Sequence, residues 1–110
     1  MAAMFERVLG CKWSLHVLDC VRRGVARPGA MQRAVPGLSA KVLAERLRRL
    51  VAFGVLERQV FAEVPPRVEY RLTPFGQRFV DILERIAALE RERREGSVRP
   101  AAVRVKEGEG

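Results

Sequence analysis

The sequence predicts a small, mainly α-helical domain that contains one β-hairpin and ends in a long helix. Three observations lead to this fold class. Apolar residues recur at helical spacing in the first half of the chain, alternate with polar residues between 55 and 72, and return to helical spacing after 73. A chain of 110 residues is long enough for one domain with a small core.

Two helices are expected before residue 36. The segment 11–23 carries Trp13 and Val17 on one apolar face, and the glycine that follows it ends the helix. A shorter helix is expected from Pro28, which suits a first helical position, to about Val35.

The third helix has the strongest sequence signals. Ser39 is a natural N-cap, and Gly54 is placed to end the helix. Leu43, Leu47 and Leu50 form its inward, apolar stripe. The opposite face carries Lys41, Ala44, Glu45, Arg48 and Arg49.

A β-hairpin is expected next, because the apolar period changes to two. The segments 55–62 and 67–72 are its strands, and the alternation is clearest in the second. Pro65 and Pro66 cannot donate hydrogen bonds to a strand ladder, so we expect them in the connecting loop.

The last helix is expected to begin with Thr73 as its N-cap and Pro74 in its first turn. The domain is predicted to span residues 1–95, and residues 96–110, which lack periodicity, are expected to form a disordered tail. An apolar stripe runs along this helix through Phe79, Ile82, Leu83, Ile86 and Leu89.

This stripe is longer than a three-helix body can cover, so another surface must bury its far end. The simplest cover is the same helix of a second copy, together with Phe5 and Val8 of the N-terminal segment, which predicts a homodimer. The alternative is that the stripe folds back onto its own body.

The charge distribution indicates a polyanionic partner. The chain has 21 basic and 13 acidic residues, and the net charge of +8 is already reached by residue 80. A basic folded body favours nucleic acid, most simply double-stranded DNA. The competing interpretation is that the high arginine content reflects the composition of the source genome.

Several other functions are not supported by the sequence. It contains no paired carboxylates in an apolar setting, no nucleophile with a nearby base and no glycine-rich phosphate loop, so we do not expect an enzyme. With His16 as the only histidine and two cysteines at unhelpful spacing, we expect neither a metal site nor a cofactor. The absence of a membrane span or secretory signal favours the cytoplasm and no membrane partner.

Three helices followed by a hairpin form the winged helix-turn-helix arrangement. In this fold the third helix enters the major groove of DNA, and the hairpin loop, or wing, contacts an adjacent groove or the backbone. The predicted function is therefore sequence-specific DNA binding. The alternative is the same fold used for protein contacts or for non-specific nucleic-acid binding.

Three segments carry a family resemblance. "LGCKWSLHVL", "VPGLSAKVLAERLRRLVAFGVLER" and "EVPPRVEYRLTPFGQ" resemble the corresponding segments of HxlR-type bacterial transcriptional regulators, which have a MarR-like winged helix. The resemblance covers roughly residues 9–83. It implies a homodimer joined through the terminal helices and a pseudo-palindromic operator.

The fold and the resemblance together give the expected DNA contacts. In the third helix these are Ser39, Ala40, Lys41, Val42, Ala44, Glu45, Arg48 and Arg49, and at the wing tip they are Val64, Pro65, Pro66 and Arg67. We expect Arg67 to project toward DNA from a loop that the prolines restrict, with Glu63 orienting it.

The cysteines differ from those of many HxlR-type relatives, which carry a cysteine in an N-terminal Cys-Pro segment that some members use to sense oxidants or electrophiles. By the family's spacing that position falls just before Met1, so we expect this chain to lack it. Cys11, at a helix start where a thiolate is stabilised, is the candidate redox residue. On one helix, Cys11 and Cys20 would be about 13 Å apart, too far for a disulfide within the chain. No small-molecule effector can be named from the sequence.

Overall fold

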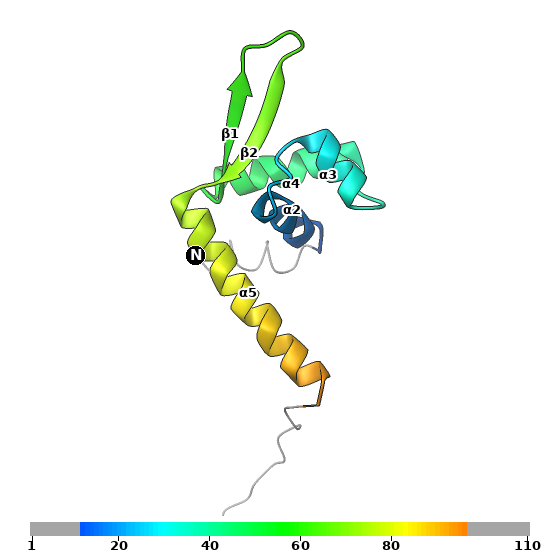
Figure 1. Ribbon diagram of the computed structural model, residues 1–110, viewed down its shortest axis with the longest axis vertical. Helices are drawn as coiled ribbons and strands as arrows, with labels where there is room; N and C mark the ends of the chain where they lie inside the picture. Colours follow the sequence, from blue (N-terminus) through cyan, green and yellow to red (C-terminus); the bar gives the residue numbers. More distant parts are fainter. Residues whose placement is uncertain (1–11, 97–110) are drawn as a thin grey trace, which may run out of the picture.

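The computed structural model describes residues 12–96, which form four helices and one hairpin (Figure 1). The helices are α2 (Lys12–Arg22), α3 (Pro28–Ala34), α4 (Ala40–Ala52) and α5 (Pro74–Arg94). The strands are β1 (Leu56–Phe61) and β2 (Arg67–Leu72), between α4 and α5. The predicted order of elements is confirmed, and so is the winged helix-turn-helix arrangement.

The hairpin is antiparallel, with Leu56 opposite Leu72 at its base and Phe61 opposite Arg67 near its tip. The first strand is one residue shorter at each end than the sequence suggests. Pro65 and Pro66 lie in the loop, as predicted, and the Val64–Pro65 peptide bond is cis.

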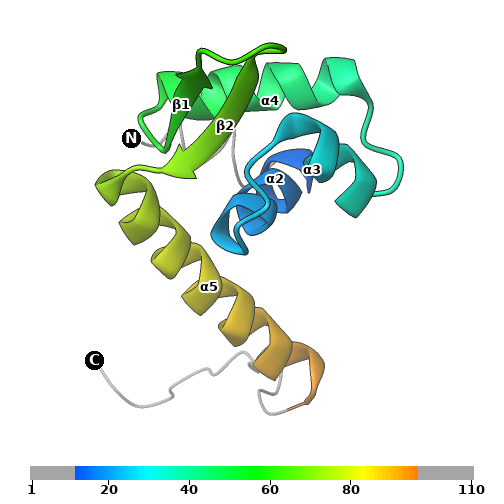
Figure 2. The same ribbon diagram turned by 45° about the horizontal axis from the view of Figure 1, so that its top comes forward.

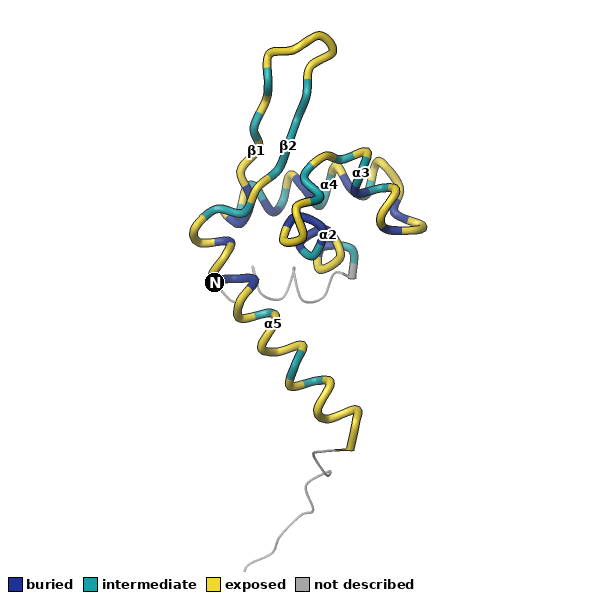
Figure 3. Tube along the Cα trace, in the orientation of Figure 1, coloured by how far each residue is buried: buried dark blue, intermediate teal, exposed yellow. Residues whose placement is uncertain are grey.

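The core lies where α2, α3, α4 and the base of the hairpin meet (Figure 3). The leucine stripe of α4 is buried there, and Met31 of α3 and Val17 of α2 pack in the same cluster. These helices bury one face each because their apolar residues recur with the helical period. The tip of the hairpin and the far part of α5 remain exposed.

The junction between the hairpin and α5 is tightly built. The Thr73 hydroxyl donates to the Gly54 carbonyl and accepts from the backbone N–H of Gly76, at 2.9 Å in the second case. A Cβ atom at Gly76 would lie 1.9 Å from the carbonyl oxygen of Val55, so only glycine fits there. The α4 and α5 helices therefore diverge in fixed directions from the base of the hairpin (Figure 2).

Candidate nucleic-acid interface

The N-terminal turn of α4 is held by its cap. The Ser39 side chain accepts a hydrogen bond of 3.2 Å from the backbone N–H of Val42. This bond satisfies one of the free donors at the helix start. Ser39, Ala40 and Lys41 are exposed in this turn, so their side chains are available to a partner.

On the face of α4 that points away from the core, some basic side chains pair with a carboxylate and others do not. Lys41 and Arg48 are exposed, and within residues 12–96 no carboxylate pairs with either side chain. Arg49 is already engaged, because it donates to Glu45 at 2.6 Å. Glu45 also lies 3.3 Å from Arg46, so one carboxylate is shared by two arginines and offsets only part of their positive charge.

Two further predicted contacts on α4 have different surroundings. Ala44 is exposed and adds no bulk between Lys41 and Arg48. Val42 is half-buried and packs against the hydrophobic core. Of the predicted contacts on α4, Val42 is therefore the one whose side chain serves the core.

The wing tip is open to a partner. Val64, Pro65 and Pro66 are all exposed at the far end of the hairpin (Figure 3). Proline restricts the backbone of such a loop before binding, so less conformational entropy is lost when the loop contacts a partner.

Arg67 does not project from the tip, so that part of the sequence prediction is wrong. Its guanidinium lies over the Phe61 ring, 4.1 Å from the ring centre, and its side chain is only 31% exposed. The expected pairing with Glu63 is confirmed, at 3.3 Å, and Glu69 lies 3.2 Å from Arg67 Nε. Two carboxylates and an aromatic face hold Arg67 against the hairpin.

Two arginines next to the wing were not predicted from the sequence. Arg27 and Arg33 line a cleft between α3 and β2, together with Arg67. The backbone N–H of Tyr70 donates to the carbonyl of Ala26 at 2.8 Å, which joins the segment before α3 to β2. This contact links residues far apart in sequence, so no local pattern could reveal it.

The arrangement of a capped, exposed helix beside a wing matches a known family. The family model of the HxlR-like helix-turn-helix matches residues 8–97. The chain belongs to the HxlR-like helix-turn-helix family. This match confirms the resemblance seen in the three sequence segments.

The relatives are regulators from several organisms. The HTH-type transcriptional regulator sll1512 of Synechocystis sp. is 43% identical over 76 residues, covering 69% of this chain and 56% of the relative. The HTH-type transcriptional regulator YtcD of Bacillus subtilis is 37% identical over 81 residues, covering 74% of this chain and 64% of the relative. The chain thus spans less than two thirds of the length of these two proteins, both of which are described as HTH-type transcriptional regulators.

A solved structure shows the same architecture. A protein from Enterococcus faecalis V583, described as a transcriptional regulator of the MarR family, has a TM-score of 0.78 with this chain at 33% identity. The similarity covers 87% of this chain and 86% of that chain. The fold of this chain is therefore shared with a solved structure that is described as a transcriptional regulator of the MarR family.

In this member of the HxlR-like family, α5 divides its apolar residues between the core and the surface. Phe79 is 3% exposed and belongs to the core of the chain, so it is not available for the predicted dimer contact. Leu83 is half-buried and packs against the core. Ile82 and Ile86 are both 45% exposed and Leu89 is 62% exposed. The predicted contacts Phe5 and Val8 lie outside the described residues.

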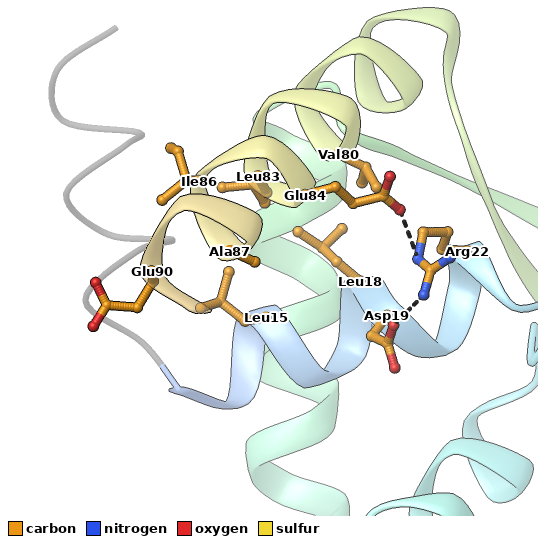
Figure 4. Close-up of a pocket in the computed structure, with 10 residues that line it drawn as sticks. All are labelled: Leu15, Leu18, Asp19, Arg22, Val80, Leu83, Glu84, Ile86, Ala87 and Glu90. Atoms are coloured by element: carbon orange, nitrogen blue, oxygen red, sulfur yellow. Dashed lines mark hydrogen bonds and ion pairs between the residues drawn. The ribbon is translucent and has the colours of Figure 1, made fainter. Parts of the chain in front are cut away.

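A groove of about 370 Å³ runs between α2 and α5 (Figure 4). Apolar side chains from both helices form most of its walls: Leu15, Leu18, Val80, Leu83, Ile86 and Ala87. Arg22 bridges the helices, with Asp19 at 2.8 Å and Glu84 at 3.0 Å. The ion pair with Glu84 joins α2 to α5, and the hydrogen bond that Arg22 donates to Asp19 raises the pKa of Arg22.

The candidate redox residue Cys11 lies outside the described residues. Cys20 is fully buried in the core, and burial raises the pKa of its thiol despite the opposing effect of nearby Arg23. A buried, protonated thiol is a poor nucleophile. Cys20 is therefore a small core residue, in agreement with its position on the apolar face of α2.

The described part of the chain contains neither a group of metal ligands nor a membrane-spanning helix. Residues 12–96 contain no cluster of three or more histidine, cysteine, aspartate or glutamate side chains that could hold a metal ion. None of the helices in this range is both long enough and apolar enough to span a membrane.

Proposed function

We propose that this HxlR-like protein is a sequence-specific, DNA-binding transcriptional regulator that acts as a homodimer on a two-part operator. The observation that carries the proposal is the outer face of α4, where Lys41 and Arg48 are exposed without carboxylate partners in the described residues. In a bacterium, such a regulator acts in the cytoplasm, where the chromosome lies.

Base reading would come from the first turns of α4. Its leucines are buried in the core, so the opposite face is free to enter a major groove, which is wide enough for an α-helix. Lys41 lies in the first turn, where it can donate to guanine O6 and N7. Arg48 lies two turns further along and suits a phosphate contact.

The wing would bind beside this helix. Its exposed tip, formed by Val64, Pro65 and Pro66, is narrow and carries no charge of its own. The tip suits contact with an adjacent groove, with Arg67 held in place by Glu63 and Glu69. The main role of Arg67 would then be to order the wing, and its charge would contribute less to DNA binding.

The dimer would form through α5. Ile82, Ile86 and Leu89 are large apolar residues on one exposed face, and burial against a second copy would remove them from water. Helix α5 and the hairpin point to opposite ends of the protomer, so pairing through α5 leaves the wing free (Figure 1). Two α4 helices would then enter major grooves about 34 Å apart.

Selection from a library of random duplexes tests the proposal. The protein is expected to enrich a site with two inverted halves about one helical turn apart and to retain it against excess unselected DNA. Enrichment of no sequence, with binding that fades equally for all duplexes as salt rises, would instead favour non-specific charge attraction. No binding to any duplex would favour a winged helix used for protein contacts.

A further inference from the structure

The cleft between α3 and β2 gathers three arginines from two separate elements. Arg27 and Arg33 come from the α3 side and Arg67 from the hairpin. The cleft has a volume of about 430 Å³, and Pro66 and Val68 complete its hairpin wall. None of its lining residues is acidic.

The positive charge of the cleft comes from the α3 side. Arg67 is offset by Glu63 and Glu69 at 3.3 and 3.2 Å. Within the described range 12–96, no carboxylate pairs with Arg27 or Arg33, and both residues are exposed. Two uncompensated cations therefore face a solvent-filled cleft, an arrangement that attracts an anion.

The cleft is also built on fixed backbone. The hydrogen bond from Tyr70 N–H to the Ala26 carbonyl holds the residue before Arg27 against β2. The Arg27 carbonyl accepts from the N–H of Met31 at 3.0 Å, and the Met31 side chain is completely buried. The positions of the arginine backbones relative to the wing are therefore set before any ligand binds.

Small residues keep the cleft open. Gly29 and Ala30, which lie between the two arginines in the sequence, also line the cleft. Neither residue has side-chain atoms beyond Cβ. A Cβ atom added at Gly29 would lie 3.6 Å from Arg33 Nη1, so one guanidinium nitrogen of Arg33 lies next to this glycine. A sugar–phosphate backbone can approach such a surface closely.

We propose that this cleft binds a backbone phosphate of DNA and that Arg27 and Arg33 are the residues that contact it. The inference rests on the proposed function. When α4 lies in a major groove and the wing tip in the adjacent minor groove, the strand that separates these grooves crosses the surface between the helix-turn-helix and the hairpin. The cleft lies on that surface, and guanidinium groups match the geometry of phosphate oxygens.

Salt dependence of binding tests the contact without knowledge of the operator. The probe is a fluorescein-labelled duplex of random sequence of about 30 base pairs, titrated by anisotropy between about 50 and 200 mM salt. The double variant Arg27→Gln/Arg33→Gln is expected to reduce the slope of log affinity against log salt by about 0.9, the value for one lost phosphate contact, and each single variant is expected to give part of this reduction. Arg27→Lys and Arg33→Lys, which keep the charge, are expected to retain most of the slope.

The matched control is Arg91→Gln. Arg91 is exposed on α5, away from the hairpin, and no carboxylate of the described residues pairs with it, so the variant loses the same charge elsewhere. Slopes for Arg27→Gln and Arg33→Gln equal to that of Arg91→Gln would overturn the inference while leaving the proposed function intact. Failure of the wild-type protein to bind any duplex at about 50 mM salt would overturn both.

Discussion

The arginines of this chain have different roles because their surroundings differ. Arg48 is exposed and unpaired within the described residues, whereas Arg49, one residue later, is held by Glu45 at 2.6 Å. Arg67 contacts two carboxylates and the Phe61 ring. The net charge alone therefore overstates the positive charge that is available to DNA. The positions of the unpaired cations are a better guide to where DNA binds.

The buried thiol of Cys20 is expected to be unreactive in the folded protein. In a Cys11→Ser variant, where Cys20 is the only thiol, we expect no reaction with a thiol reagent near pH 8 in the native state and full reaction in denaturant. The reason is that Cys20 is buried and its pKa is raised, so the thiol stays protonated in the folded protein. Reaction in the native state at the rate of a free thiol would show that the core opens at α2.

Among the helices and strands, α4 and the wing have separate tasks in the proposed complex. Helix α4 offers Lys41 at a capped N-terminus, where base edges can be reached. The wing offers a stiff, exposed tip and an arginine that its own carboxylates hold in place. Changes in the two elements should therefore affect binding in different ways.

Lys41→Ala and Arg67→Ala separate these tasks. Lys41→Ala is expected to cost about 1–3 kcal/mol on the selected site and to relax the preference at one position of each half. Arg67→Ala removes one cation, leaves Glu63 unpaired and leaves Glu69 with Arg71 alone, so it should weaken binding to selected and random duplexes by the same factor. Anisotropy titrations of both variants on both duplexes measure the difference.

Equal effects of the two variants would contradict separate tasks for α4 and the wing. If both variants weaken binding to every duplex by similar factors, base reading by α4 is wrong. Circular dichroism should first show unchanged helix content for both, because Lys41 is exposed and Arg67 lies outside the core.

Local signals in the sequence predicted most of the elements. Ser39 and Thr73 were expected as N-caps, and both side chains accept the expected backbone hydrogen bonds. Gly54 was expected to end α4, and its φ of +79° is a conformation that favours glycine. Caps, turns and apolar periods depend on neighbouring residues, so one sequence can reveal them.

Features that depend on tertiary contacts were harder to predict. Phe79 has the same helical spacing as Ile82 and Ile86, yet it packs in the core, since the base of α5 adjoins the hairpin junction. The orientation of Arg67 depends on Phe61 from the opposite strand. The arginine cleft depends on the contact between Ala26 and Tyr70. In each case the deciding partner lies on another element.

For the entire chain, the exposed part of α5 is the feature that a monomer leaves unexplained. Ile82, Ile86 and Leu89 form an exposed apolar face, and Arg22 pairs with Glu84 between α2 and α5. An exposed apolar helix face suits a two-fold interface, in which the same face meets itself.

Ile86→Glu tests this interface. An acidic residue there would be buried without a partner, so we expect dimer affinity to fall by at least about 30-fold, equivalent to about 2 kcal/mol. Light scattering coupled to gel filtration should show a dimer for the wild type at micromolar concentration and a monomer for the variant. Val64→Glu is the matched control, because it introduces the same negative charge at the fully exposed wing tip. A wild-type monomer, or a dimer unaffected by Ile86→Glu, would remove α5 as the interface.

Hydroxyl-radical footprinting on the most enriched duplex examines the complete arrangement directly. A dimer with α4 in two successive major grooves should protect two blocks on one face of the DNA, centred about 10 base pairs apart, with weaker flanking protection by the wings. The Ile86→Glu variant should lose the paired pattern at the same protein concentration. A single protected block from the wild-type protein, or uniform weak protection along the duplex, would contradict a homodimer that reads a two-part operator.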